Sequence, residues 1–168
     1  MKNYVVLACL LLSSVFAYAA KLTSGSLDCL KGEKFLAVSL DCSKMTYKKT
    51  RPFEEFLQKA PRMENWEHES LKYFIELFNE KTCKQGFATV FNTSKNKGKY
   101  ELIIVPSDIN GGGGITAVAN LVNTETGSIE ATIEFSTDGD DDDKITLRDP
   151  MKEAGEQIGK LISKAIKK

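Results

Sequence analysis

The chain has 168 residues, of which 42% are hydrophobic and 27% are charged, with 23 Lys+Arg against 23 Asp+Glu. This composition fits one globular domain and excludes a disordered chain. The formal net charge is zero. No overall positive field would therefore attract a phosphate backbone, and nucleic acid is not an expected partner.

The first residues have the pattern of a secretory signal. A basic start precedes an apolar run over 4–16, and Ala17-Tyr18-Ala19 matches the small-residue rule for signal peptidase. We predict a signal peptide over 1–19 and a single domain over 20–168, exported to the periplasm or secreted. Two alternatives remain. One is a membrane anchor, although about 13 apolar residues are fewer than the roughly 20 that span a bilayer. The other is a lipoprotein modified at Cys9.

Three cysteines remain after signal cleavage, namely Cys29, Cys42 and Cys83. An odd number in an oxidising compartment leaves one thiol unpaired. All three pairings are possible, and we favour Cys29–Cys42, which would hold irregular chain against the first strand. Alternatively, all three are free and packed as small hydrophobic residues.

The first half of the mature chain predicts one strand and two helices. The dense apolar run over 35–40 is too short for a helix and suits a central strand. A cap followed by an early proline at 50–52 begins a short helix, which Pro61 ends. Apolar residues at helical spacing then predict a long amphipathic helix over 64–83, with Gly86 near its end.

Four strand-like segments follow, over 87–92, 99–105, 115–122 and 128–135. In the last of them, Ile129, Ala131, Ile133 and Phe135 alternate with polar residues, which predicts that these four face the core. Gly127 allows the positive φ of a short hairpin turn before this strand. The residues 96–98 predict a similar turn between the first two of these segments.

Asp149 and Pro150 predict the start of a final helix, with Asp149 as its N-cap. Its apolar stripe would pack on the sheet, and Gly155 and Gly159 would allow close approach to strands. An alternative is that this basic helix binds anionic lipid. The order of elements predicts an α+β, two-layer sandwich with about five mostly antiparallel strands and three helices covering one face.

Histidine chemistry is largely excluded, because His68 is the only histidine. A zinc-protease helix needs a second histidine one turn later, where this chain has Lys72. No motif marks His68 as the base of a nucleophilic triad. The glycines at 111–114 precede a strand instead of a helix, so they predict a pliable connection and not a phosphate loop.

The acidic loop contains five carboxylates in the six residues from Asp138 to Asp143. Spacing partly like that of an EF-hand makes Asp138, Asp140, Asp142 and Asp149 candidate ligands of a weakly bound Ca²⁺. The loop lacks the usual central glycine and final glutamate, so a solvated loop without metal is the alternative. No other cofactor is indicated.

The segment from Tyr100 to Phe135 contains Y-E-L-I-I-V-P, a glycine run and the turn N-T-E-T-G, and the chain closes with A-G-E-Q-I-G-K-L-I-S-K-A-I-K-K. This combination resembles small bacterial envelope domains of the curli-secretion channel lipoprotein and of the amino terminus of the Tol-system propeller protein. The resemblance implies a non-catalytic envelope domain engaged in protein assembly or binding. It carries over no active-site residue, and the helices over 52–83 and the acidic loop depart from it.

We therefore predict an exported, non-enzymatic binding or assembly module, without a transmembrane segment in the mature chain. Its expected partner is another envelope or extracellular protein, bound through the sheet surface or an edge strand. Two alternatives remain open. One is a small hydrolase that acts on cell-wall or sugar substrates through carboxylates, although no spacing singles out a catalytic pair. The other is a weak Ca²⁺-binding module that uses the acidic loop.

Overall fold

The structure, a computed structural model, describes residues 19–59, 65–93, 95, 98–139 and 147–167. The strands are β1 (Lys21–Gly25), β2 (Phe35–Leu40), β3 (Thr46–Tyr47), β4 (Arg51–Pro52), β5 (Ala88–Phe91), β6 (Tyr100–Ile109), β7 (Ile115–Asn123) and β8 (Ile129–Ser136). The helices are η1 (Asp28–Leu30), α2 (Phe53–Lys59), α3 (Trp66–Thr82), η2 (Cys83–Gln85) and α4 (Arg148–Ala165). The predicted signal peptide lies outside the described residues, apart from Ala19.

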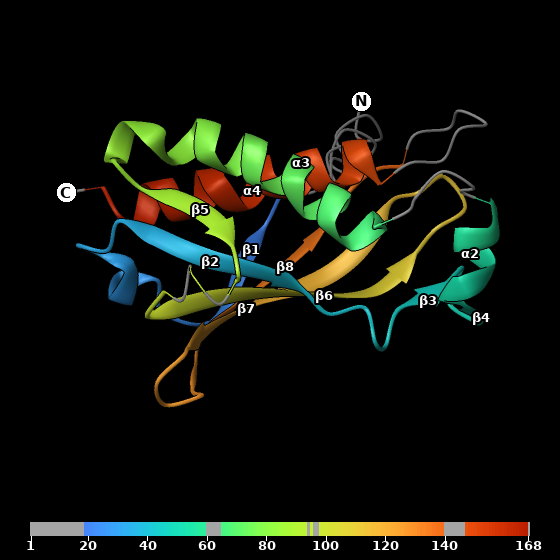
Figure 1. Ribbon diagram of the computed structural model, residues 1–168, viewed down its shortest axis with the longest axis horizontal. Coiled ribbons are helices and arrows are strands. Elements are labelled where there is room, and N and C mark those ends of the chain that lie inside the picture. Colours follow the sequence, from blue (N-terminus) through green and yellow to red (C-terminus); the bar gives the residue numbers. More distant parts are fainter. Residues whose placement is uncertain (1–18, 60–64, 94, 96–97, 140–146, 168) are drawn as a thin grey trace, which may run out of the picture.

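The described strands form one eight-stranded mixed sheet with the order β1-β8-β7-β6-β2-β5, and β3 pairs with β6 and β4. Helices α3 and α4 lie side by side over one side of this sheet (Figure 1). Helix α2 packs on the short β3–β4 pair at one end. The predicted sandwich of about five mostly antiparallel strands is therefore wrong, although the fold combines helices and a sheet as expected.

The main error concerns the pairing of β2. This strand lies between β5 and β6 and runs parallel to both, so the predicted turn at residues 96–98 does not join paired strands. Parallel neighbours need a long crossover, and the chain between β2 and β5 contains α3, which covers the sheet as it returns. Strand β1 was missed because its K-L-T-S-G sequence is almost fully exposed and gives no apolar alternation.

The predicted β7–β8 hairpin is confirmed. Its turn ends at Gly127, which has φ +74° and donates a 2.8 Å hydrogen bond to the carbonyl oxygen of Asn123. One residue of this hairpin differs from the prediction. A register shift pairs Leu121 with Ala131 but Val122 with Ile129, and Ile129 is 59% exposed. A bulge of this kind turns a side chain out of the strand's alternation.

The two long helices approach each other closely at the glycines of α4. A Cβ built on Gly155 would lie 2.3 Å from the Phe74 carbonyl oxygen, and one on Gly159 would lie 3.0 Å from the Phe78 carbonyl oxygen. The glycines therefore face α3, and not strands as predicted. Only a residue without a side chain permits this distance between the backbones.

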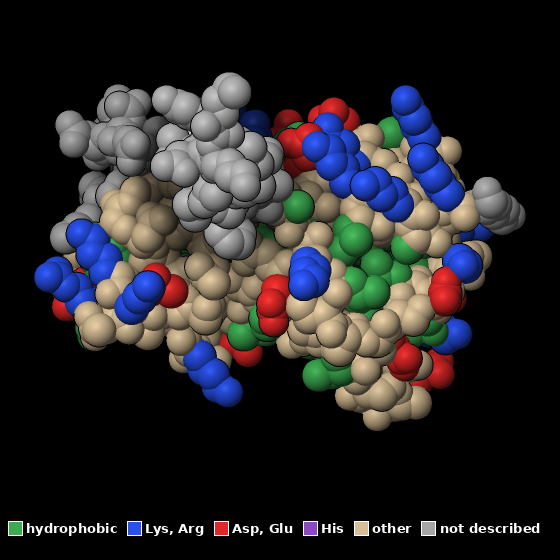
Figure 2. Space-filling view, turned by 180° about the vertical axis from the view of Figure 1, so that it is seen from behind, with side chains coloured by type: hydrophobic (Ala, Val, Ile, Leu, Met, Phe, Trp, Pro, Cys, Tyr) green, Lys and Arg blue, Asp and Glu red, His purple; other side chains and the backbone are tan. Residues whose placement is uncertain are grey.

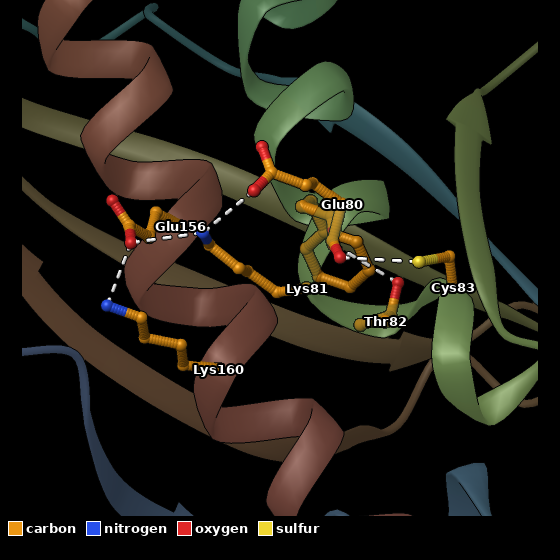
Figure 3. A network of polar contacts seen from close by, with 7 residues as sticks. Glu80, Lys81, Thr82, Cys83, Glu156 and Lys160 are labelled. Atoms are coloured by element: carbon orange, nitrogen blue, oxygen red, sulfur yellow. Dashed lines mark hydrogen bonds and ion pairs between the residues drawn. The ribbon is translucent and has the colours of Figure 1, made fainter.

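An ion-pair network also joins the two helices (Figure 3). Lys81 Nζ of α3 lies 3.2 Å from Oε1 of Glu80 and 3.2 Å from Oε1 of Glu156. Lys160 Nζ lies 2.8 Å from the same Glu156 oxygen. The hydrogen bonds from Lys160 and Lys81 hold the pKa of Glu156 below its usual range. Because these groups are partly exposed, we expect a contribution below about 1 kcal/mol to stability.

The core lies between the helices and the sheet. Its largest fully buried side chains come from both layers and from the segments at either end: Leu30, Leu36, Tyr47, Phe56, Phe74, Phe78, Phe87, Leu102, Ile104, Ile109, Leu121 and Ile133. The predicted final helix packs here, with Ile158 and Ile162 fully buried.

Helix α4 begins at Arg148, and Asp149 is not its N-cap, because that position belongs to Leu147. Within the described ranges, no helix combines the length and apolar character needed to cross a bilayer.

Candidate binding surface

The predicted calcium ligands are only partly described. The Asp138 backbone N–H donates a 2.9 Å hydrogen bond to Glu153 Oε2, and Asp149 is exposed in the first turn of α4. Asp140 and Asp142 lie outside the described residues. Elsewhere in the described chain, no group of three or more His, Cys, Asp or Glu side chains could hold a metal. The calcium site stays a prediction.

Cys29, Cys42 and Cys83 are free thiols in the structure, and the Cys29–Cys42 pairing stays a prediction. Cys29 lies in η1 before β2, whereas Cys42 follows the end of β2, so the strand separates them. Burial, with smaller effects of Glu67 and Asp41, raises the pKa of Cys42 to about 12. A thiol that stays protonated at neutral pH is a poor nucleophile.

None of the helices α2, α3 and α4 packs on the side of the sheet opposite α3 and α4 (Figure 1), although Gly98 lies against Phe35 and Ala37 at one end of it. We call this side the open face. By strand alternation and register it carries Ala37, Ser39, Val90, Glu101, Ile103, Val105, Val118, Asn120, Val122, Thr132 and Glu134. An antiparallel sheet with one face in water usually places polar residues there. The open face departs from that pattern at its centre.

Aliphatic side chains occupy that centre. Val105 and Val118 stand opposite each other across β6 and β7. Ile103 is opposite Asn120, which lies between Val118 and Val122 on β7, and Val122 is opposite Glu101. The four aliphatic side chains are half-buried. The exposed Ile129 extends this group, because its register partner is Val122. Sequence analysis missed this surface, since a β-branched residue is expected on either face of a strand.

A small hollow of about 280 Å³ adjoins these residues, lined by Ala37, Asn92, Gly98, Glu101 and Thr124. Glu101 Oε1 accepts hydrogen bonds from Ser39 Oγ and from Asn92 Nδ2, the latter at 2.7 Å. Glu101 is the one carboxylate among the lining residues. The arrangement fits recognition of a hydrogen-bond donor, whereas hydrolysis by paired acids would need a second carboxyl group.

A wider hollow of about 570 Å³ lies where β2 ends and α3 begins. Its lining includes Phe53 and Trp66, whose ring centroids are 4.9 Å apart, together with Asp41, Glu54 and Glu67. Hydrogen bonds from Ser43 hold the pKa of Asp41 below its usual range. A general acid needs a raised pKa instead, so Asp41 is unsuited to that role.

The sole histidine does not contribute to either hollow. His68 stacks on Phe91, with ring centroids 4.5 Å apart and planes at 9°. This places His68 on the side of the sheet that carries α3.

Comparison with known proteins gives only a weak likeness. No model of a known protein family matches the chain, and no curated protein sequence matches it. A solved PelC dodecamer from Paraburkholderia phytofirmans is 12% identical, covers 89% of this chain and 97% of that chain, and has a TM-score of 0.45. A methionine variant of that dodecamer is 13% identical, covers 86% and 93%, and has a TM-score of 0.43. Both scores are too low to say what this chain does or how it assembles. The resemblance to the curli and Tol domains stays a prediction.

Proposed function

We propose that the protein is an exported, non-enzymatic binding module that docks a protein partner on the open face of its sheet. One observation carries this proposal. The half-buried side chains of Ile103, Val105, Val118 and Val122 surround Asn120 on the sheet face opposite α3 and α4. Contiguous apolar surface of this kind is typical of interaction sites.

The polar residues among and beside these side chains support specific docking. Thr132 donates a 3.1 Å hydrogen bond to Asn120 Oδ1, and Glu101 accepts from two donors at the edge of the apolar group. Asn120 lies among the aliphatic side chains and Glu101 beside them, and protein interfaces combine apolar contact with such hydrogen-bonding groups. The partner would then bury the four aliphatic side chains. Its own hydrogen-bond donors would bind to Asn120 or Glu101, beside or in place of the present donors.

The reactive groups of the described chain argue for binding and not for catalysis. The Cys42 thiol has a raised pKa, and Asp41 has a lowered one. The only histidine stacks on Phe91. Both pKa shifts are opposite in direction to those that activate a thiol nucleophile or a carboxylic general acid. Export to the envelope and the identity of the partner as an envelope protein are part of the proposal.

Site-specific photocrosslinking in the native host tests the proposed surface. A benzophenone side chain replaces Val118, and in a matched control it replaces Gln58, which is exposed on α2 away from the open face. We expect a discrete adduct from position 118 and none from position 58. The double variant Val105→Lys/Ile103→Lys should abolish the adduct without unfolding the protein, because both side chains are only half-buried.

A second charge-adding variant, Thr50→Lys/Gln58→Lys, controls for added positive charge. Both positions are exposed and lie away from the open face, so the adduct from position 118 should persist. Equal adducts from positions 118 and 58, or loss of the adduct in this control, would contradict docking on the open face. Turnover of peptidoglycan or oligosaccharide by the purified protein would contradict the non-enzymatic assignment.

A further inference from the structure

A third hollow, of about 520 Å³, lies at the end of the molecule where α3 and α4 finish. Four segments form it: the end of η1, the link from η1 to β2, η2 with the glycine after it, and the residues after α4. Its lining is Leu30, Gly32, Glu33, Lys34, Lys84, Gln85, Gly86, Ile166 and Lys167. In Figure 2, this is the right-hand end, where several Lys or Arg side chains stand beside hydrophobic ones.

The lysines of this hollow differ from most others that flank the helices. Lys31, Lys81 and Lys160 each form an ion pair with an acidic residue. In contrast, Lys34 and Lys84 are exposed and form no ion pair with any described residue, and the same is true of Lys167. Their charges are therefore available to a ligand.

One acidic residue lies in the lining, and it does not neutralise these lysines. Glu33 is 4.0 Å from Lys99, which is outside the hollow. Among the described residues, the lining thus carries three positive charges without an ion-pair partner and one negative charge that is partly compensated by Lys99. We call it the basic hollow.

The floor and corners of the basic hollow leave room for a ligand. Leu30 is fully buried and Ile166 partly buried, so the floor is apolar. A Cβ built on Gly32 or Gly86 would meet no atom within 4 Å. Both glycines have positive φ, +92° and +67°, which explains why these corners carry no side chain.

Helix dipoles explain only part of this charge distribution. Lysines near the ends of α4 and η2 would complement the carbonyl ends of the helices, and this applies to Lys167 and Lys84. Lys34 belongs to no helix and immediately precedes β2. Its presence beside the other two indicates that the charges are collected around the hollow itself.

We propose that the basic hollow docks the protein on a bilayer by receiving the phosphate of an anionic phospholipid. The three lysines are opposite in charge to the phosphate, and the partly buried Ile166 offers apolar surface to the start of the acyl region. Lysines near an anionic membrane surface strengthen binding by roughly fivefold each, so three of them supply roughly 100-fold.

Vesicle flotation of the purified mature protein tests this site. The probes are vesicles of phosphatidylcholine alone and of phosphatidylcholine mixed equally with phosphatidylglycerol. We expect binding only to the mixed vesicles, and a loss of roughly 100-fold in partitioning for Lys34→Gln/Lys84→Gln/Lys167→Gln. Raising the salt from about 0.1 M to about 1 M should abolish binding, because the screening length falls from about 10 Å to about 3 Å.

The control variant Lys21→Gln/Lys44→Gln/Lys95→Gln removes the same number of charges from exposed positions outside the hollow. Its partitioning should change far less than that of the hollow variant, because lysines more than a screening length of about 10 Å from the membrane contribute little. An equal loss in both variants would overturn the site in favour of a general charge effect. Absence of binding to the mixed vesicles would overturn the proposal outright. Saturable binding of soluble glycerol phosphate together with no binding to the mixed vesicles would assign the hollow to a free phosphate ester and overturn the bilayer proposal.

Discussion

The two faces of the sheet differ although they share the same strands. On β6, Leu102 and Ile104 are 0% exposed beneath the helices, whereas Ile103 and Val105 between them are half-buried on the open face. One face is closed by α3 and α4, and none of α2, α3 and α4 packs on the other. Neighbouring residues of one strand thus differ in environment: those on the covered face stabilise the fold, and those on the open face form the surface on which we propose that a partner docks.

The largest expected effect is a difference between two adjacent isoleucines. We expect Ile104→Ala to lower the free energy of unfolding by about 3 kcal/mol, because it opens a cavity in the core. Ile103→Ala should lower it by less than about 1 kcal/mol, because this side chain already contacts water. Urea denaturation of both variants measures the difference. Equal effects would mean that the open face is buried in the free protein.

The packing of α3 against α4 can be tested at Gly155 and Gly159, where the two helix backbones come closest. Gly155→Ala should destabilise the protein by about 2 kcal/mol, because the new Cβ would lie 2.3 Å from the Phe74 carbonyl oxygen and force α3 and α4 apart. Gly159→Ala should cost less, since its Cβ would lie 3.0 Å from the Phe78 carbonyl oxygen. Thermal unfolding ranks the two variants. A gain of about 1 kcal/mol in both, as in an exposed helix, would contradict this packing.

Glu101 tests the polar part of the open face. Glu101→Ala should cost about 1 kcal/mol, because Ser39 and Asn92 lose their shared acceptor. Glu101→Gln keeps an acceptor oxygen and should cost less. Chemical denaturation of the two variants checks the order. If Gln and Ala were equally destabilising, the negative charge and not the hydrogen bonds would be the stabilising feature.

The smallest expected effect is the pH dependence of the ion-pair network on the helices. The lowered pKa of Glu156 means that its contribution is present above the unfolded pKa, ordinarily 4.5, and is lost as the pH falls through the folded pKa. The free energy of unfolding of Glu156→Gln should therefore fall less than that of the unmodified protein between about pH 5 and about pH 3, and the two decreases should differ by less than about 1 kcal/mol. Glu76→Gln, at an exposed position of α3, serves as the control. An equally flattened profile for that control would contradict a specific role of Glu156.

The candidate surfaces were less predictable than the elements that carry them. The sequence suggested binding through a sheet face or an edge, but it did not indicate which residues form the open face. The basic hollow joins Lys34, Lys84 and Lys167, which are far apart in the chain. Such juxtapositions depend on which strands and helix ends become neighbours, and local periodicity contains no information about that.

Local chemistry alone determined several elements of this protein. Helical spacing predicted α3 and α4, and the turn residues before Gly127 predicted the β7–β8 hairpin, because both patterns reflect contacts between residues close in sequence. Tertiary structure decided the rest. It inserted β2 between β5 and β6, turned Ile129 outward through a register shift, and directed Gly155 toward α3. These outcomes depend on pairing between distant segments, which is settled only when the sheet and its helical layer pack together.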